Sequence, residues 1–207
     1  MTRSHRRACR CVFQGVNEME LLGNRICSIC RGNTGLFGNR KLYDGRMCKS
    51  CAKKTSPHIK DIRKTTISDM KAHLAYREAN KTEVAGFNAS RTIGTSTRLL
   101  IDEDTSKFVI STAVDWRSEN PDVISFSQVR RCTTMIKRKL SGATPSTYHY
   151  EYDFYVTFYL DLLHIDAIEI KLNLFSVPLS SKSYAEYERM QNDIRDLFQK
   201  AVAITEQ

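Results

Sequence analysis

The sequence predicts an α+β chain in which a small metal-binding module precedes an antiparallel β domain closed by a C-terminal helix. Two Cys-x-x-Cys pairs lie between residues 27 and 51. Apolar and polar residues alternate along residues 148–162 and 168–174, which is typical of strands with one buried face. An amphipathic stripe follows from residue 183 onward. With 207 residues, 41% of them hydrophobic, the chain is long enough for one or two modest domains with a real core.

The two cysteine pairs predict a structural zinc site. The pairs are separated by 17 residues, a spacing typical of four-cysteine zinc modules. Each Cys-x-x-Cys turn directs two thiolates toward one point, and the chain between them brings the second pair round to complete a tetrahedron. Four thiolates leave no open position for water, so we expect one structural Zn²⁺ rather than a catalytic one. The expected ligands are Cys27, Cys30, Cys48 and Cys51.

Disulfides and a redox dithiol are the competing uses of close cysteines. The first residues lack the apolar core of a secretory signal, and the sequence contains no apolar run long enough to cross a bilayer. We therefore expect a cytoplasmic chain with reduced thiols, and a redox dithiol needs only one pair. Cys9 and Cys11, in an Arg-rich arm, are expected not to bind metal. Cys132 lies in an apolar stretch and is expected to be a core residue.

Between the cysteine pairs, the Asp44-Gly45 turn signal predicts a small hairpin formed by residues 40–43 and 46–48. Good helix formers follow Cys51 and end before Pro57. This order of knuckle, hairpin and short helix favours a treble-clef zinc finger. A ribbon of two hairpins remains the other topology.

A connecting helix is expected from about residue 67 to residue 82. Thr66 stands at a plausible N-cap and Asp69 lies three positions on, in capping-box register. His73 lies in this helix without another histidine at ligand spacing, so we expect it to be a packing or solvated residue. A hairpin is then predicted over residues 98–111, and one or two further strands over residues 123–140.

The C-terminal part gives the clearest strand and helix signals. Residues 148–162 and 168–174 form a predicted hairpin that turns near Leu163–Asp166. Ser183 and Glu186 stand in capping-box register at the start of the last helix. Its apolar stripe is expected to pack on the sheet and consists of Tyr187, Met190, Ile194, Leu197, Phe198, Ala201 and Ile204.

Four segments are expected along the chain: a disordered basic arm over residues 1–24, the zinc finger over 25–60, a helical connector over 61–85 and the β domain over 86–207. The formal net charge is +9. Residues 1–64 contain 15 Lys and Arg against 4 Asp and Glu, whereas the remainder contains 17 against 19. The basicity is therefore N-terminal, and a Zn²⁺ ion with four thiolates would offset part of it. Met19 is an alternative start of the chain.

The stretch "CSICRGNTGLFGNRKLYDGRMCKSCAKKTSP", with "AHLAYREANK" and "FNASRTIG" after it, resembles the bacterial proteins of unknown function that carry an N-terminal DUF4428 zinc-finger domain. The resemblance covers roughly residues 25–95 and implies zinc at the four cysteines. The later strand order with its terminal helix resembles pleckstrin-homology-like (PH-like) domains. That likeness implies an antiparallel β-barrel or sandwich closed by the C-terminal helix. Neither resemblance implies an enzymatic activity.

No enzymatic function is expected. The five histidines are scattered, and the sequence has neither a Gly-rich phosphate loop nor a nucleophile motif. We expect no small-molecule substrate and instead an adaptor that binds protein partners through the finger and the PH-like domain. The cations at residues 130–139 belong to a slightly acidic domain, so membrane binding is not expected.

The alternative to the adaptor is a nucleic-acid-binding finger, because phosphates attract clustered basic residues. The spacing of the cysteine pairs also resembles that of GATA-type fingers, although the chain lacks the long basic tail that follows them. The residues that would contact nucleic acid are Arg31, Arg40, Lys41, Arg46, Lys49, Lys53 and Lys54.

Overall fold

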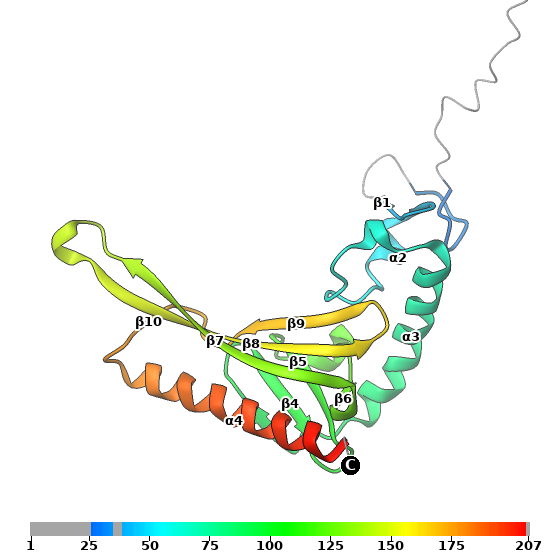
Figure 1. Cartoon of the computed structure of the whole chain (residues 1–207). Coiled ribbons are helices and arrows are strands. Elements are labelled where there is room, and N and C mark those ends of the chain that lie inside the picture. Colours follow the sequence, from blue (N-terminus) through cyan, green and yellow to red (C-terminus); the bar gives the residue numbers. More distant parts are fainter. Residues whose placement is uncertain (1–25, 35–38, 206–207) are drawn as a thin grey trace, which may run out of the picture.

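A computed structural model describes residues 26–34 and 39–205. The chain is α+β: a cysteine-containing finger stands at one end of a long helix, and the other end of that helix lies against two antiparallel sheets (Figure 1). The basic arm expected over residues 1–24, with Cys9, Cys11 and Met19, lies outside the described residues. None of the described helices combines the length with the apolar character needed to span a bilayer.

The finger consists of a knuckle, a hairpin and a helix of one turn. The hairpin pairs β1 (Arg40–Lys41) with β2 (Arg46–Met47), as the turn signal predicts, and α2 (Lys49–Ala52) follows directly. The turn is tightly enclosed. A Cβ atom on Gly45 would lie 2.6 Å from Ser28 Oγ and 2.8 Å from Ile67 Cδ1, so any larger residue would have to displace these two side chains.

A short 3-10 turn, η1 (Ile62–Lys64), leads into the long helix α3 (Ile67–Gly86). The predicted capping box is confirmed, because Thr66 and Asp69 each accept the other's backbone N–H. The Asp44 carboxylate of the hairpin turn also accepts the Ile67 N–H at 2.7 Å, which ties the finger to the start of α3. The helix continues to Gly86, four residues beyond its predicted end.

The remaining strands form two four-stranded sheets that are antiparallel throughout. The first has the order β3-β4-β5-β6, with β3 (Arg91–Ile93), β4 (Arg98–Asp102), β5 (Lys107–Ser111) and β6 (Ile124–Ser125). The second contains β7 (Val129–Ser141), β8 (His149–Leu162), β9 (Ile165–Lys171) and β10 (Val177–Pro178). Between strands lie the 3-10 turns η2 (Trp116–Glu119), η3 (Phe126–Gln128) and η4 (Pro145–Thr147).

The expected barrel does not close among the described strands. Both β9 and β10 pair with the same side of β8, and β7 pairs with β8 alone, so β7 is left as an edge strand. The register of β7 and β8 continues to the pair Ser141↔His149, which carries their hairpin beyond β9 and past the last β10 pair, Pro178↔Glu151 (Figure 1). We call residues 136–150 the hairpin arm. The two sheets form a sandwich with a shared core, which is the other arrangement expected.

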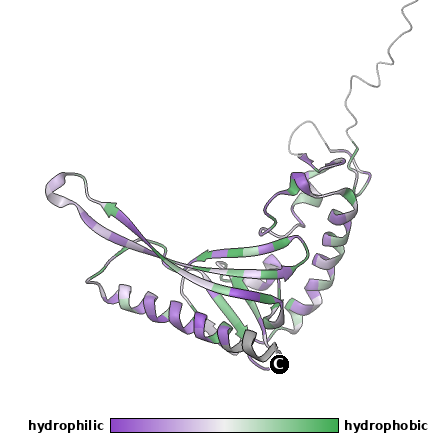
Figure 2. Cartoon of the chain, viewed as in Figure 1, coloured by the Kyte–Doolittle hydropathy of each residue, from purple (hydrophilic) through white to green (hydrophobic). Residues whose placement is uncertain are grey.

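An aromatic cluster occupies the centre of this core. The Phe108 ring of the first sheet lies 5.3 Å from the Phe158 ring of the second and 4.9 Å from the Phe198 ring of the last helix. All three side chains are fully buried. Apolar and polar residues alternate along β8 and β9, as predicted, and the colours of Figure 2 follow this alternation.

The last helix, α4 (Lys182–Thr205), covers the core side of β7 and β8 (Figure 1). Its predicted stripe is confirmed where the side chains are described, with Ile194 and Phe198 fully buried. The cap differs from the expectation. The Tyr184 N–H donates to Ser181 Oγ at 3.1 Å, so the serine that satisfies the helix start stands two positions before Ser183.

The end of α3 covers the opposite face of the first sheet. Val84 and Phe87 pack there against Leu100 and Val109, which point away from the aromatic cluster. Trp116 completes this second apolar cluster, with its ring 5.5 Å from that of Phe87 in an edge-to-face arrangement. The helix predicted as a connector is thus part of two cores, because Met70 near its start is buried in the finger.

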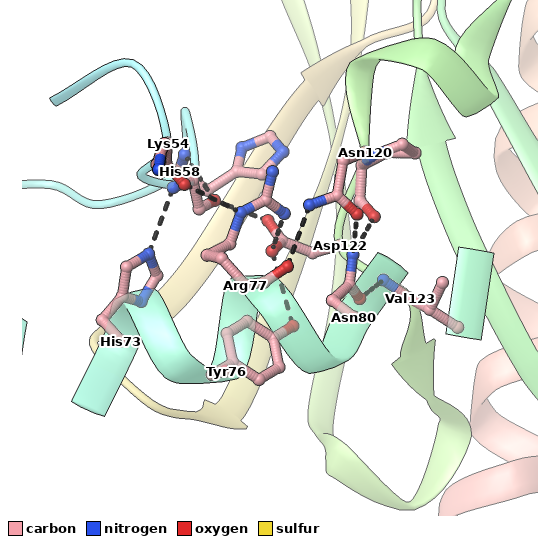
Figure 3. A network of polar contacts seen from close by, with 11 residues as sticks. Lys54, His58, His73, Tyr76, Arg77, Asn80, Asn120, Asp122 and Val123 are labelled. Atoms are coloured by element: carbon pink, nitrogen blue, oxygen red, sulfur yellow. Dashed lines mark hydrogen bonds and ion pairs between the residues drawn. The ribbon is translucent and has the colours of Figure 1, made fainter. Parts of the chain in front are cut away.

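A buried polar network fixes the middle of α3 (Figure 3). The Arg77 guanidinium donates to an Asp122 carboxylate oxygen at 2.7 Å, and the two side chains are only 7% and 1% exposed. Asp122 also accepts Ser56 Oγ at 2.5 Å and the Tyr76 hydroxyl at 3.4 Å. Arg77 donates in addition to the Lys54 carbonyl at 3.4 Å, so the network joins three separate chain segments.

Two neighbouring side chains extend the network along α3. Asn80 donates to the Pro121 carbonyl at 2.7 Å and accepts the Val123 N–H at 2.9 Å. His73 Nε2 accepts the Ser56 N–H at 3.1 Å, which requires the proton of the neutral ring to be on Nδ1. Burial lowers the pKa of His73, so the neutral ring is favoured. Hydrogen bonds stabilise buried polar groups, and the network supplies them to Arg77, Asp122 and Asn80 across the finger, α3 and the segment before β6.

Removing the Phe158 ring should destabilise the sandwich strongly. Phe158→Ala deletes a fully buried ring that contacts both Phe108 and Phe198, so we expect a loss of about 3–5 kcal/mol in the free energy of unfolding, measured by urea denaturation. Leu174→Ala is the control, because this side chain is 64% exposed and its loss should leave the urea midpoint unchanged. Equal effects of both substitutions would contradict the described core.

Removing one partner of the buried ion pair should destabilise the protein more than removing both partners. Arg77→Ala leaves the Asp122 carboxylate buried without its cation, and we expect a loss of about 3–5 kcal/mol in urea denaturation. The double variant Arg77→Met, Asp122→Leu removes both charges and should lose less than the single variant. Lys81→Ala on the same helix breaks only an exposed pair with Glu78 and should not move the midpoint. A double variant less stable than Arg77→Ala would contradict this account.

Candidate metal centre and cationic groove

The four predicted cysteines meet at one point of the finger. Their sulfur atoms all lie within 4.8 Å of one another, and they are the only group of three or more potential metal ligands in the part of the chain that is described. Cys27 and Cys30 come from the knuckle, Cys48 caps the N-terminus of α2, and Cys51 lies in its only turn. Three of the four are buried, and Cys30 is exposed.

The distances between the sulfurs fit a tetrahedral metal site. The Sγ atoms of Cys27 and Cys51 are 4.0 Å apart, and those of Cys30 and Cys48 are 3.7 Å apart. Four sulfurs at the usual zinc–sulfur length of about 2.3 Å from a central ion would be about 3.8 Å apart. A disulfide requires sulfurs about 2.0 Å apart, so all four are free cysteines. The cluster can therefore hold a thiophilic metal ion such as Zn²⁺.

Backbone N–H groups prepare two of these sulfurs for negative charge. The Cys48 N–H donates to Cys27 Sγ at 3.3 Å, and the Cys51 N–H donates to Cys48 Sγ at 3.4 Å. Hydrogen bonds from Ser50 and from the Cys51 backbone lower the pKa of Cys48 to about 6. Burial raises the pKa of Cys27, but hydrogen bonds from the Cys30, Cys48 and Ile29 backbone outweigh it and lower the pKa overall.

The fourth thiol resists ionisation unless a cation is bound. Burial, and then the neighbouring sulfurs of Cys48, Cys30 and Cys27, raise the pKa of Cys51 well above its usual value. Four thiolates at such short distances repel one another strongly, and a divalent cation at their centre removes that repulsion. The donor set is thus chemically suited to Zn²⁺, for which thiolate sulfur is a preferred ligand.

The finger's apolar core is built around the same cysteines. Leu42 and Met47 from the hairpin and Met70 from α3 are fully buried beside Cys27, Cys48 and Cys51. So small a core buries little surface, and modules of this size are usually held together by a metal or by disulfides. A metal ion bound by the four cysteines would therefore add to the stability of the finger.

A groove opens on the finger beside the metal centre. It has a volume of about 1010 Å³ and lies between the hairpin, α2 and the segment from Thr55 to Arg63. Six cationic side chains line it, and all six are exposed. We call it the cationic groove; its cations are Arg40, Lys41, Lys49, Lys53, Lys60 and Arg63.

The structure brings together only part of the predicted basic set. Arg40, Lys41, Lys49 and Lys53 line the groove, whereas Arg31, Arg46 and Lys54 lie outside it. Lys60 and Arg63 were not predicted as site residues. Their signal in the sequence is the basic run that continues after Pro57, but only the fold of the segment toward η1 shows that it returns to the hairpin.

Two of the scattered histidines meet in the fold. The rings of His73 and His164 lie 6.3 Å apart, where the start of α3 reaches the turn between β8 and β9. His73 Nδ1 and His164 Nε2 are buried without a hydrogen-bond partner. Two nitrogens do not make a metal site by themselves, and no third ligand joins them within the described ranges.

Cys132 and the cations of β7, the other residues considered as functional candidates, contact groups of the sandwich itself. Cys132 is half-buried against the sandwich core, and burial raises the pKa of its thiol to about 12, as fits an inert core cysteine. On β7, Arg131, Lys137 and Arg138 stack on tyrosine rings of β8 at 4.0 to 4.6 Å. These cations are therefore engaged in cation–π contacts within their own sheet.

Comparison with known proteins identifies the finger alone. Residues 26–73 match the family described as a domain of unknown function, DUF4428. This confirms the predicted resemblance for the four cysteines, the hairpin and the first part of α3. No curated protein and no solved structure matches the chain. The segment from Ile26 to His73 is thus similar to the DUF4428 domain and contains four cysteines positioned to bind a metal ion.

Proposed function

We propose that this chain is a non-catalytic interaction protein, an adaptor whose finger is held together by one structural zinc ion. The observation that carries the proposal is the closed cluster of four cysteine sulfurs within 4.8 Å of one another. Four protein ligands complete the coordination of Zn²⁺, so no position remains for a reactive water or a substrate. The metal then contributes folding energy rather than chemistry.

Two separate surfaces support the adaptor part of the proposal. The cationic groove lies on the finger, and the hairpin arm extends from the opposite end of the molecule (Figure 1). The arm exposes large side chains that a stable core would normally bury: Ile136, Leu140, Tyr148 and Tyr150. The buried network around Arg77 holds finger and sandwich together, so two partners bound at these surfaces would be held at a defined separation.

The sandwich is proposed to be PH-like, on the basis of its order of antiparallel strands followed by one C-terminal helix. The compartment proposed is the bacterial cytoplasm, where four reduced thiols remain available to bind zinc. The partner of the hairpin arm is proposed to be a protein, because mixed apolar and aromatic surfaces are common in protein interfaces.

Zinc content tests the metal assignment. The purified full chain should contain about one zinc per molecule by elemental analysis, and Cys48→Ser should lose most of it and unfold the finger. Fluorescence or NMR signals from the sandwich should persist in this variant, because its aromatic core lies in β5, β8 and α4. Cys132→Ser is the matched control and should keep its zinc. Stoichiometric zinc in Cys48→Ser would contradict the four-cysteine site.

The adaptor proposal requires two independent binding surfaces. The tagged full chain is cross-linked in cytosol, and its captured partners are compared with those of two surface variants. Leu140→Ser with Tyr150→Ser alters the hairpin arm, and Arg40→Ser with Lys53→Ser and Lys60→Ser alters the groove. Each variant should lose a different set of partners while zinc content and urea midpoint stay unchanged. Loss of the same set in both variants, or of none in either, would contradict an adaptor.

A further inference from the structure

We propose that the cationic groove binds single-stranded nucleic acid, with phosphates on its six cations and a base stacked on Tyr43. This inference rests on the proposed function in one respect, since it names the partner of the finger. Three features of the groove support it: cations without partners, a recessed shape and an exposed aromatic ring at the rim.

The groove cations have no anionic partners among the described residues. None of the six forms an ion pair, and the only acidic side chain in the lining, Asp61, pairs with Lys64 outside it. Several cations elsewhere in the described ranges do have partners. Arg77 pairs with Asp122, Lys107 with Glu83 and Lys171 with Asp153, and three β7 cations stack on tyrosines. Six unpaired positive charges around one groove repel one another, and a polyanion would relieve that repulsion.

The recessed shape favours a single strand over a duplex. Duplex DNA is read by a helix or a β-ribbon that projects into its major groove. Here the helix between the cations, α2, has four residues, and the cations of the hairpin, of α2 and of the segment after it line one shared hollow. A single strand is flexible enough to lie along such a hollow with its backbone on the cations. The groove also takes its lining from three chain segments, which suits an extended ligand.

Tyr43 distinguishes a nucleic acid from an acidic peptide. Its side chain is 73% exposed at the hairpin turn and lines the groove. Its backbone N–H donates to the Thr65 carbonyl at 3.0 Å, which holds this position against the start of α3. An exposed ring on a fixed backbone, beside cations, offers a stacking surface for a base. An acidic peptide would use the cations but has no base to stack on this ring.

The test measures binding of the zinc-loaded full chain to fluorescent oligonucleotides by polarisation, over a series of salt concentrations. The probes are a 12-nucleotide single-stranded RNA, the DNA strand of the same sequence, its duplex, and a poly-glutamate peptide. We expect the single strands to bind more tightly than the duplex and the peptide. The logarithm of the binding constant should fall linearly with the logarithm of salt concentration.

Two triple variants with the same charge change locate the site. Arg40→Ser, Lys53→Ser, Lys60→Ser removes three groove cations, and Arg46→Ser, Lys54→Ser, Lys71→Ser removes three exposed cations outside the groove. In the groove variant, the slope of the logarithm of the binding constant against the logarithm of salt concentration should become less negative by about 2. Binding should weaken about a hundredfold at 0.1 M salt. The matched variant should lose far less. Tyr43→Ala should weaken single-strand binding about tenfold and leave peptide binding unchanged.

Several results would overturn the proposal. Equal losses in the two triple variants would mean unspecific attraction to the whole basic finger. Tighter binding of the duplex than of the single strands would place the contact outside the recess. Tighter binding of poly-glutamate than of the single strands, unaffected by Tyr43→Ala, would indicate that the groove binds an acidic protein. If a chain that retains one zinc does not bind single strands, the nucleic-acid proposal for the groove is wrong, but the proposed structural role of zinc is not affected. A chain that purifies folded without zinc would instead remove the proposed structural role of the metal.

Discussion

The ion pair of Arg77 with Asp122 is the interaction on which the arrangement of the molecule depends. Burying two charges is expensive, and the pair is stable because hydrogen bonds from Ser56 and Tyr76 share the cost of desolvating the carboxylate. Its three contributing segments are the end of the finger, the middle of α3 and the chain before β6. The pair thus ties the end of the finger and the chain before β6 to the middle of α3, in addition to the apolar contacts that α3 makes at its two ends.

Much of the local structure could be predicted, because it follows from chemistry written in short stretches of sequence. Closely spaced cysteine pairs are typical of tetrahedral thiolate coordination, so the spacing of Cys27, Cys30, Cys48 and Cys51 identifies the candidate metal centre. The Asp44-Gly45 turn identifies the hairpin, and Thr66 with Asp69 identifies the start of α3. Alternation along β8 and β9 identifies the core face of the second sheet. Each of these signals lies within a few residues of the structure it produces.

The features that escaped prediction join residues distant in the chain. Asp122 is a single carboxylate in a loop, and nothing near it indicates a partner 45 residues earlier. Lys60 and Arg63 reach the groove only because the segment after α2 folds back on the hairpin. The barrel was expected from strand order, but closure depends on pairing. Both β9 and β10 occupy one side of β8, which no local pattern encodes.

The helix α3 contributes Met70 to the finger core and Val84 to the cluster on the first sheet. It therefore acts as a rigid spacer between the finger and the sandwich. Each residue of an α-helix adds a rotation of about 100° and a rise of about 1.5 Å. One residue inserted between Met70 and Val84 would therefore turn the finger by about a quarter of a circle relative to the sandwich. An insertion of seven residues would nearly restore the angle while lengthening the helix by about 10 Å. The length of this helix therefore sets both the distance and the orientation between the finger and the sandwich.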